Sequence, residues 1–414
     1  MRIAMRKPAT AAMGRKGTMM PATLGPYAAA ATLISLAVLV AFAVVGATAV
    51  GGGRALASQV SCGDTITADT TLQQDLVNCP NNGIVIGADG ITLDLNGHLV
   101  DGDGTPAATC DPRNELCDVG VANDGHDGVA VMHGSVREFG LGVLFGTSTA
   151  GQVRDNRVLG VSSTANQFAG LGIFSSLRSL VRNSSGDNSL DREGSGMLLG
   201  DSHQVRILNN SFRHNTHNGI TTVQNSTRNL IKGNQFVRNG DEAILMEGGN
   251  RFRVTGNRFA RNGAGISLGP GSRNVITRNR VSQGRDGIRI EKGHDNLVAD
   301  NVVVAARTGI RLGIHEPFIG GAHNVLRENL VRDSRVDAFV VLKKDTHSLL
   351  LGNIAKGAGD DGFDVESRSA KLTGNRAVRN ADLGVEAVFG LIDGGGNIAR
   401  DNGDPRQCTN IFCR

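Results

Sequence analysis

The chain has 414 residues, with 57 glycines, 9 prolines, one tyrosine and no tryptophan. Its formal net charge is +4, but residues 1–57 hold six basic and no acidic side chains, so the rest of the chain has 37 basic against 39 acidic residues. The basic excess therefore belongs to the N-terminal segment, and the remaining chain lacks the overall positive charge typical of nucleic-acid-binding proteins.

Residues 1–57 have the pattern of an export signal. A basic stretch precedes an apolar run over 28–50, and Ala55-Leu56-Ala57 then supplies a small-x-small cleavage motif before Ser58. This pattern predicts a cleaved signal peptide and a secreted or extracytoplasmic mature protein. The apolar run is also long enough to cross a bilayer. An uncleaved N-terminal anchor is therefore the alternative, and it would be the one membrane contact expected for the protein.

Residues 58–125 are expected to form an N-terminal cap, the first coils of a repeat and an irregular insertion. Short apolar strands are predicted at 84–86 and 91–95, before the Asp-rich stretch 105–125. All six cysteines follow the leader, and an even number in an exported chain predicts disulfides. Sequence alone does not choose among the possible pairings, but proximity favours Cys62–Cys79, Cys110–Cys117 and Cys408–Cys413. The last of these would tie down the C-terminal tail, 404–414.

Residues 126–403 contain a repeat marked by asparagine. Successive members are 22 to 28 residues apart, and several follow a glycine, as in Gly256-Asn257. Short runs of alternating apolar residues flank them, such as 274–277 and 287–290, which predicts half-buried strands. The recurring positions are Asn156, Asn183, Asn210, Asn234, Asn257, Asn279, Asn301, Asn329, Asn353, Asn375 and Asn397.

A period of this length predicts a solenoid, because one coil cannot bury its apolar side without neighbours. We expect an all-β fold, a single-stranded right-handed parallel β-helix of about 11–13 coils. Equivalent residues of neighbouring coils would then lie about 4.8 Å apart. At that spacing the recurring asparagines would form a ladder of amide–amide hydrogen bonds.

The repeat over residues 83–402 resembles that of the pectin-lyase-like group of parallel β-helix proteins, which includes NosD-like proteins, polysaccharide lyases and epimerases. The resemblance implies the fold and a carbohydrate-related role, although this scaffold hosts many activities. The motif of the β-helix galacturonan hydrolases is not matched, because Arg289-Ile290 precedes Gly359-Asp360-Asp361 rather than following it. The Asp-Pro-His motif of alginate epimerases is also missing, so no catalytic residue is transferred from a family.

Alignment of the coils predicts an outward-facing column on the strands that follow glycine. It runs through Thr221, Leu245, Ser267, Arg289, Arg311, Val340, Asp364 and Glu386. Asp364 and Glu386 are candidates for a catalytic acid and base, since neighbouring carboxylates can separate their pKa values. Arg289 and Arg311 are candidates to bind a uronate, together with Glu291, Glu366 and His315. The alternative is a strand face of solvated charges that Glu291 and Glu366 compensate.

Two further groups are candidate metal ligands. Asp360 and Asp361 could join the acidic pair in holding Ca²⁺. His323 and His347 fall in adjacent coils and could bind copper or zinc, whereas a polar turn ladder is the simpler interpretation. His315 lies in the Gly-flanked His315-Glu316-Pro317-Phe318 loop of the longest coil, a position where solenoids often place binding groups.

These features predict an exported protein that binds or modifies an acidic polysaccharide or cell-envelope glycan, with no nucleic-acid partner. If it is an enzyme, the resemblance implies a polysaccharide lyase, an epimerase or a glycoside hydrolase. The alternatives are a non-catalytic surface, structural or adhesion protein of the cell envelope, and a NosD-like extracytoplasmic copper-handling protein.

Overall fold

The computed structural model describes residues 59–105, 117–147, 151–223, 225–314 and 320–414. These residues form strands and no helix, and every pairing between strands is parallel. No helix in this part of the chain could span a membrane. The predicted leader, 1–57, and the loop containing His315 lie outside the described residues.

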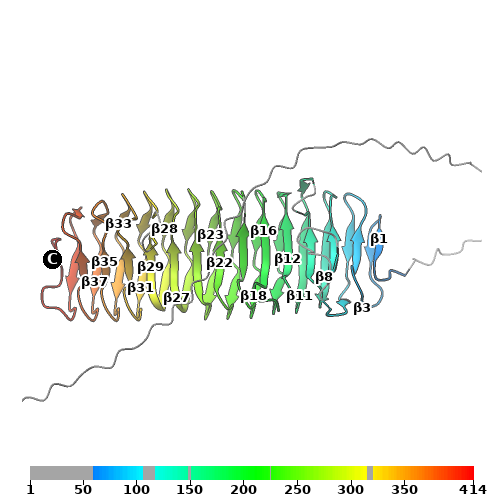
Figure 1. Cartoon of the computed structure of the whole chain (residues 1–414), viewed down its shortest axis with the longest axis horizontal. Helices are drawn as coiled ribbons and strands as arrows, with labels where there is room; N and C mark the ends of the chain where they lie inside the picture. The colour runs from blue at the N-terminus through cyan, green and yellow to red at the C-terminus, as the bar shows by residue number, and fades with distance from the viewer. Residues whose placement is uncertain (1–58, 106–116, 148–150, 224, 315–319) are drawn as a thin grey trace, which may run out of the picture. The chain divides into compact units, whose positions relative to one another are not determined.

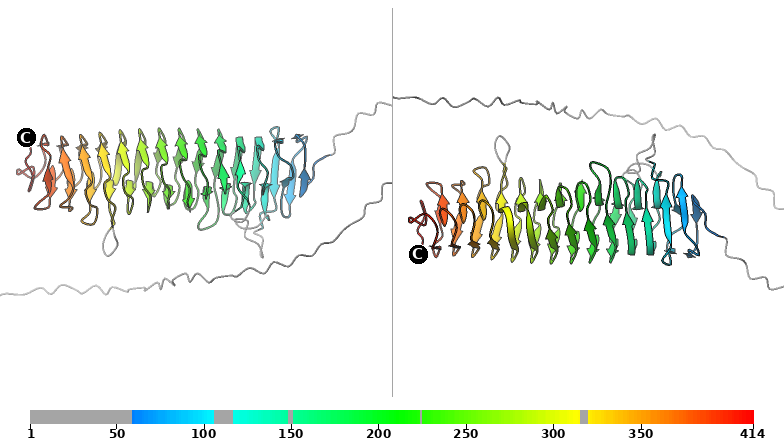
Figure 2. Two further views of the ribbon diagram at one scale, coloured as in Figure 1. Left: turned by 90° about the horizontal axis from the view of Figure 1, so that it is seen from above. Right: turned by 90° about the horizontal axis from the view of Figure 1, so that it is seen from below.

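The chain winds into a right-handed solenoid with three strands in each turn, as one representative turn shows. β22 (Glu242–Met246) is followed by β23 (Arg253–Thr255) and β24 (Arg258–Ala260), after which β25 (Ala264–Leu268) pairs with β22. About 14 such turns stack side by side in chain order (Figure 1). The same order is visible from two opposite sides (Figure 2). The predicted parallel β-helix is therefore confirmed, with slightly more turns than expected.

Equivalent strands of successive turns form three parallel sheets. Sheet 1 contains β1 (Asp64–Ile66), β4 (Ile84–Ile86), β7 (Val119–Asn123), β9 (Leu141–Phe145), β12 (Ala169–Phe174), β16 (Ser195–Gly200), β19 (Ile220–Val223), β22, β25, β32 (Phe339–Val341), β35 (Phe363–Val365) and β38 (Val385–Ala387). Sheet 2 contains β2 (Thr70–Thr71), β5 (Thr92–Asp94), β14 (Leu180–Arg182), β17 (Arg206–Leu208), β20 (Leu230–Lys232), β23, β26 (Val275–Thr277), β28 (Leu297–Ala299), β30 (Val325–Arg327), β33 (Leu349–Leu351), β36 (Lys371–Thr373) and β39 (Ile392–Asp393). Sheet 3 contains β3 (Leu76–Cys79), β6 (Leu99–Gly102), β15 (Ser185–Asp187), β18 (Ser211–Arg213), β21 (Gln235–Val237), β24, β31 (Leu330–Arg332), β34 (Ile354–Lys356), β37 (Arg376–Val378) and β40 (Ile398–Arg400).

Four long strands join two sheets. β8 (Ala130–Arg137) and β11 (Arg157–Thr164) run through sheets 2 and 3, and β27 (Arg280–Ile290) and β29 (Val302–Leu312) run through sheets 3 and 1. A short extra pairing joins β10 (Val153–Arg154) to β13 (Ser176–Leu177).

The inward face of each sheet forms one continuous apolar core. Alternate residues of each strand point inward, and stacking brings equivalent residues of successive turns into contact. Phe212, Phe236 and Phe259 stack in this way on sheet 3, with ring centroids 5.2 and 4.9 Å apart. Phe339 and Phe363 do so on sheet 1 at 4.7 Å. This burial explains why the apolar positions alternate along each strand in the sequence.

The predicted asparagine ladder is present at the corner between sheets 2 and 3. From Asn210 to Asn397, each amide Nδ2 donates to Oδ1 of the equivalent asparagine in the next turn, at 3.0 to 3.2 Å. The same Oδ1 atoms accept backbone N–H groups, as Asn301 does from Asn279 at 3.0 Å. The ladder therefore satisfies the backbone groups that a buried corner would otherwise leave unpaired.

Two expected members do not belong to this ladder. Asn183 is one residue too early and has a φ of 53°, while Ser184 occupies the corner and donates its backbone N–H to Asn210 Oδ1 at 2.9 Å. Asn156 lies at a different corner, directly before β11. The residue before each ladder position has a positive φ, as Gly256 does at 64°, which explains the repeated Gly-Asn pairs.

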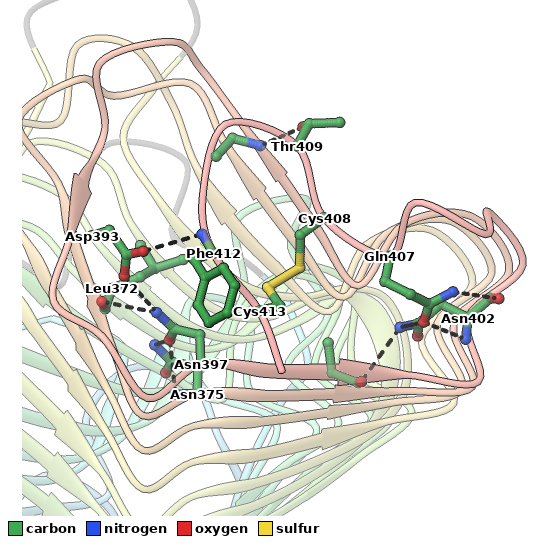
Figure 3. Close-up of a disulfide and its surroundings, with 12 residues drawn as sticks. Leu372, Asn375, Asp393, Asn397, Asn402, Gln407, Cys408, Thr409, Phe412 and Cys413 are labelled. Carbon is green, nitrogen blue, oxygen red and sulfur yellow. Dashed lines mark hydrogen bonds between the residues drawn. A yellow bond between two sulfur atoms is a disulfide. The ribbon is translucent and has the colours of Figure 1, made fainter.

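Two of the predicted disulfides are confirmed. Cys62 pairs with Cys79, and Cys408 pairs with Cys413. Figure 3 shows how the second of these holds the tail against the last coil. There Gln407 Oε1 accepts a hydrogen bond of 2.9 Å from Asn402 Nδ2, so a tail side chain takes the place of the next turn. The third predicted pairing depends on Cys110, which lies outside the described residues.

Candidate functional site

The outward column on sheet 1 is confirmed in register. Ladder pairing places Ser267 beside Arg289, Arg289 beside Arg311, and Asp364 beside Glu386. Val340 separates the basic pair from the acidic pair. Neighbouring members lie one strand spacing apart, about 4.8 Å. Sequence reasoning therefore placed six charged residues, including Glu291 and Glu366, on one face of one sheet.

The two arginines are neutralised by carboxylates of their own face. Arg289 Nη2 lies 2.8 Å from Glu242 Oε1, and its Nε lies 3.0 Å from Glu291 Oε1. Asp286 Oδ2 lies 3.4 Å from Arg289 Nη1 and 3.2 Å from Arg311 Nη2. The four side chains other than Glu291 are 5–15% exposed, so this is a largely desolvated ion-pair network. Glu291 pairs with Arg289 as the alternative interpretation expected, but the network is buried rather than solvated and does not include Glu366. A pair of free guanidinium groups is not observed.

The acidic end of the column differs, because within the described ranges no ion pair joins Asp364 or Glu386 to a cation. Burial raises the pKa of Asp364 to about 7, and the charges of Asp337, Glu366 and Glu386 add to that increase. Burial also raises the pKa of Asp361 to about 8, opposed by its hydrogen bond from Leu383 N and reinforced by its hydrogen bond to Glu386. Near neutral pH, Asp361 and Asp364 therefore retain protons that carboxyl groups with ordinary pKa values would have lost.

Asp360 and Asp361 belong to the group best placed to hold a cation. Together with Asp337 they bring three carboxylate oxygens within 4.8 Å of one another. Among the described residues no other three histidine, cysteine or acidic side chains converge in this way. Carboxylate oxygens are the ligands that Ca²⁺ prefers. The chain could therefore supply part of a Ca²⁺ coordination shell at this place.

The histidine pair forms a stack at the turn between sheets 1 and 2. The His323 and His347 rings are 5.1 Å apart and nearly parallel, and both residues have a positive φ, as Arg251 and Arg273 do in the same turn of earlier coils. His203 and His294 fall one position earlier, in the bridge column. The arrangement matches the polar turn ladder that the sequence allowed.

Three adjoining depressions form a groove along the outer face of sheet 1, which we call the sheet 1 groove. The first, of about 480 Å³, is lined by Leu245, Ser267 and Arg289, and the second, of about 540 Å³, by Arg289, Arg311 and Asp364. The third, of about 950 Å³, is lined by Asp364, Glu366 and Glu386. Consecutive depressions share lining residues, so the groove follows the stacking direction over seven positions of the column.

Sequence reasoning missed three acidic members of this site: Glu242, Asp286 and Asp337. Each lies three residues before a member of the outward column, in the same register position as Asp361. The signal was therefore available in the coil alignment. It was hidden because the predicted column was built only from the outward residues that follow glycine, and these acids come before the Gly or Ala at that position.

Comparison with known proteins agrees with this fold. The family model for the right-handed β-helix region matches residues 125–240 and 222–335, about half of the chain. No curated protein matches the sequence.

Solved structures that are similar to this chain include a periplasmic alginate epimerase (12% identity, 80% of this chain and 74% of that one, TM-score 0.40). They also include the surface adhesin PfbA of Streptococcus pneumoniae (12%, 81% and 83%, TM-score 0.44) and a mannuronan C-5 epimerase module of Azotobacter vinelandii (15%, 75% and 79%, TM-score 0.38).

Proposed function

This chain belongs to the right-handed β-helix family, and from that premise we propose that it binds a polysaccharide in the sheet 1 groove and acts on it with Asp364 and Glu386. The groove supports this proposal because it is elongated and open, as a site for a polymer must be. Confirmed disulfides fit a protein that works outside the cytoplasm.

The observation that supports the chemistry is the pairing of Asp364 with Glu386. The two residues are direct ladder partners, so their Cα atoms lie about 5 Å apart. Asp364, with a pKa of about 7, retains a proton near neutral pH and can donate it to a leaving oxygen. Glu386 is exposed beside it and supplies a carboxylate that can act as base or nucleophile. Asp361, hydrogen-bonded to Glu386, would position that carboxylate.

The arginines have a positioning role in this proposal. Arg289 and Arg311 already pair with Glu242 and Asp286, so they hold the groove floor together rather than offering two free guanidinium groups. Arg307 lines the second depression beside Asp364 and is exposed, which makes it the better candidate to contact a sugar hydroxyl or carboxylate.

The test is turnover of uronate and neutral polysaccharides, with and without added Ca²⁺, followed by product analysis. We expect Asp364→Asn/Glu386→Gln to lose activity by about a hundredfold or more. The control Asp300→Asn/Glu328→Gln removes two carboxylates outside the groove and is expected to retain activity. Equal turnover by both double variants would remove the catalytic assignment.

A non-catalytic surface role is the second candidate, and the self-neutralised network around Arg289 favours it. Such a network stabilises the stack without leaving its charges available to a substrate. No turnover of any polymer by the wild-type protein, combined with retained glycan binding, would select this role. A requirement for Ca²⁺ would implicate Asp337, Asp360 and Asp361.

A further inference from the structure

A strongly basic surface covers sheets 2 and 3 over four consecutive coils; we call it the basic face. Between residues 202 and 283 only three residues are acidic, Asp241, Glu242 and Glu247, and all lie in or directly beside β22 of sheet 1. The strands and turns of sheets 2 and 3 in the same coils expose twelve cations: Arg206, Arg213, Arg228, Lys232, Arg238, Arg251, Arg253, Arg258, Arg261, Arg273, Arg278 and Arg280.

Stacking brings some of these cations next to one another, while others, such as Arg206 and Lys232, have an uncharged partner in the next coil. Arg258 and Arg280 are direct ladder partners at the start of β24 and β27. Arg228, Arg251 and Arg273 occupy the same turn position of successive coils, with φ of 56°, 57° and 57°. Like charges held one strand spacing apart repel one another and lower stability.

Little of this repulsion is compensated, since acidic charge reaches the face mainly at its edges, from Asp187 near Arg213 and Asp295 near Arg273. In the described part of the chain, none of the twelve cations forms an ion pair, and the side chains of Arg213 and Arg261 donate to the amide oxygens of Gln235 and Gln283. Elsewhere, arginines of the solenoid do pair with acids, as Arg137 does with Asp101 at 2.7 Å. A largely uncompensated column of arginines is therefore a local feature, and it leaves the guanidinium groups free to meet an anionic partner.

We propose that the basic face binds an acidic polysaccharide whose chain follows the stacking direction. In the turn column of Arg228, Arg251 and Arg273, the cations repeat at about 4.8 Å, a spacing close to the length of one pyranose residue in an extended chain. Guanidinium groups can also bind carboxylates or sulfates with two parallel hydrogen bonds. This binding does not depend on chemistry in the sheet 1 groove, which lies on a different sheet.

Two other anionic partners fit the surface less well. Single-stranded nucleic acids are usually held by exposed aromatic side chains on which bases stack. Here the phenylalanines of these coils, Phe212, Phe236, Phe252 and Phe259, are buried. An anionic membrane would favour apolar side chains that insert into it, and none of the exposed large apolar residues in the described structure lies between 202 and 283.

The experiment measures binding of polygalacturonate, dextran, single-stranded DNA and anionic lipid vesicles to the full chain by calorimetry at several salt concentrations. We expect tight, salt-sensitive binding of polygalacturonate and none of dextran. In Arg251→Gln/Arg253→Gln/Arg258→Gln/Arg280→Gln, affinity for polygalacturonate should fall about tenfold or more. Glutamine already occupies the turn position of Arg251 in an earlier coil, at Gln204, so the variant is expected to fold.

The matched control is Arg327→Gln/Lys371→Gln/Arg379→Gln/Arg400→Gln, which removes four exposed cations from later coils, one of them in a turn with positive φ. Its affinity should equal that of the wild type. Equal losses in both variants would show that net charge rather than this face is responsible and would overturn the proposal. Tighter binding of DNA or vesicles than of polygalacturonate would also overturn it. If Asp364→Asn/Glu386→Gln lost turnover but still bound polygalacturonate, the sheet 1 groove and the basic face would be shown to act as separate sites.

Discussion

Arg311 is paired with Asp286 of the preceding coil, with Nη2 and Oδ2 3.2 Å apart, and both side chains are at least 86% buried. The same carboxylate oxygen also lies 3.4 Å from Arg289. The carboxylate of Asp286 therefore bridges two stacked arginines that would otherwise repel each other on the groove floor.

Replacing Asp286 should lower the stability of the folded protein. We expect Asp286→Ala to lower the free energy of unfolding by about 2–4 kcal/mol, because two mostly buried guanidinium groups lose their shared partner. The control is Asp155→Ala, which breaks an exposed pair with Arg178 and should cost less than about 1 kcal/mol. Chemical denaturation of both variants provides the comparison, and equal losses would contradict a desolvated network.

The asparagine ladder should be sensitive to a single deletion. Asn279 is buried, its amide donates to Val254 O and Asn301 Oδ1, and its Oδ1 accepts from Asn257. We expect Asn279→Ala to destabilise the protein by about 2–4 kcal/mol, because several buried groups lose their partners at once. Gln235→Ala, at an exposed strand position, should change stability by less than about 0.5 kcal/mol. Thermal unfolding followed by circular dichroism would show the difference.

We expect the ionisation of Asp361 to lower the free energy of unfolding as pH rises. Its pKa is about 8 in the folded protein and near 3.8 when unfolded, so between these values the unfolded state binds fewer protons and is favoured by increasing pH. Above pH 8 the penalty is complete, and below pH 4 it is absent. We expect Asp361→Asn to be more stable than the wild type at pH 8.5, by about 1–3 kcal/mol, and to lose this advantage at pH 3.5. Asp401→Asn, at an exposed turn, should show no such crossover.

The pKa of Asp364 should depend on the charges of its neighbours. The charge of Glu366 contributes to raising the pKa of Asp364 to about 7, so Glu366→Gln should lower that pKa. If Asp364 is the proton donor, activity should decline as pH rises through about 7 in the wild type, and in the variant this decline should begin at lower pH. Titration of the Asp364 carboxyl carbon by NMR measures the same shift without requiring turnover. An unchanged pKa in Glu366→Gln would show that the charge of Glu366 does not contribute.

Sequence by itself determined the repeat, the sheet register and the outward column. These were predictable because a solenoid maps a fixed sequence interval onto a fixed spatial step, so Arg289 and Arg311, or Asp364 and Glu386, had to become neighbours once the period was known. Two disulfides were also predictable, because their cysteines are close in the chain.

The tertiary structure decided which charged side chains are paired and which pKa values are shifted. Whether Arg289 is free depends on Glu242, which lies two coils away and touches it only across the stacked sheet. The raised pKa of Asp361 depends on burial, which a sequence does not display. The total charge of the chain beyond residue 57 conceals the basic face, because in the coils between 202 and 283 winding separates the acids on sheet 1 from the arginines on sheets 2 and 3. Charge pairing depends on distance in space, and the side-chain positions that set those distances emerge only when the coils stack.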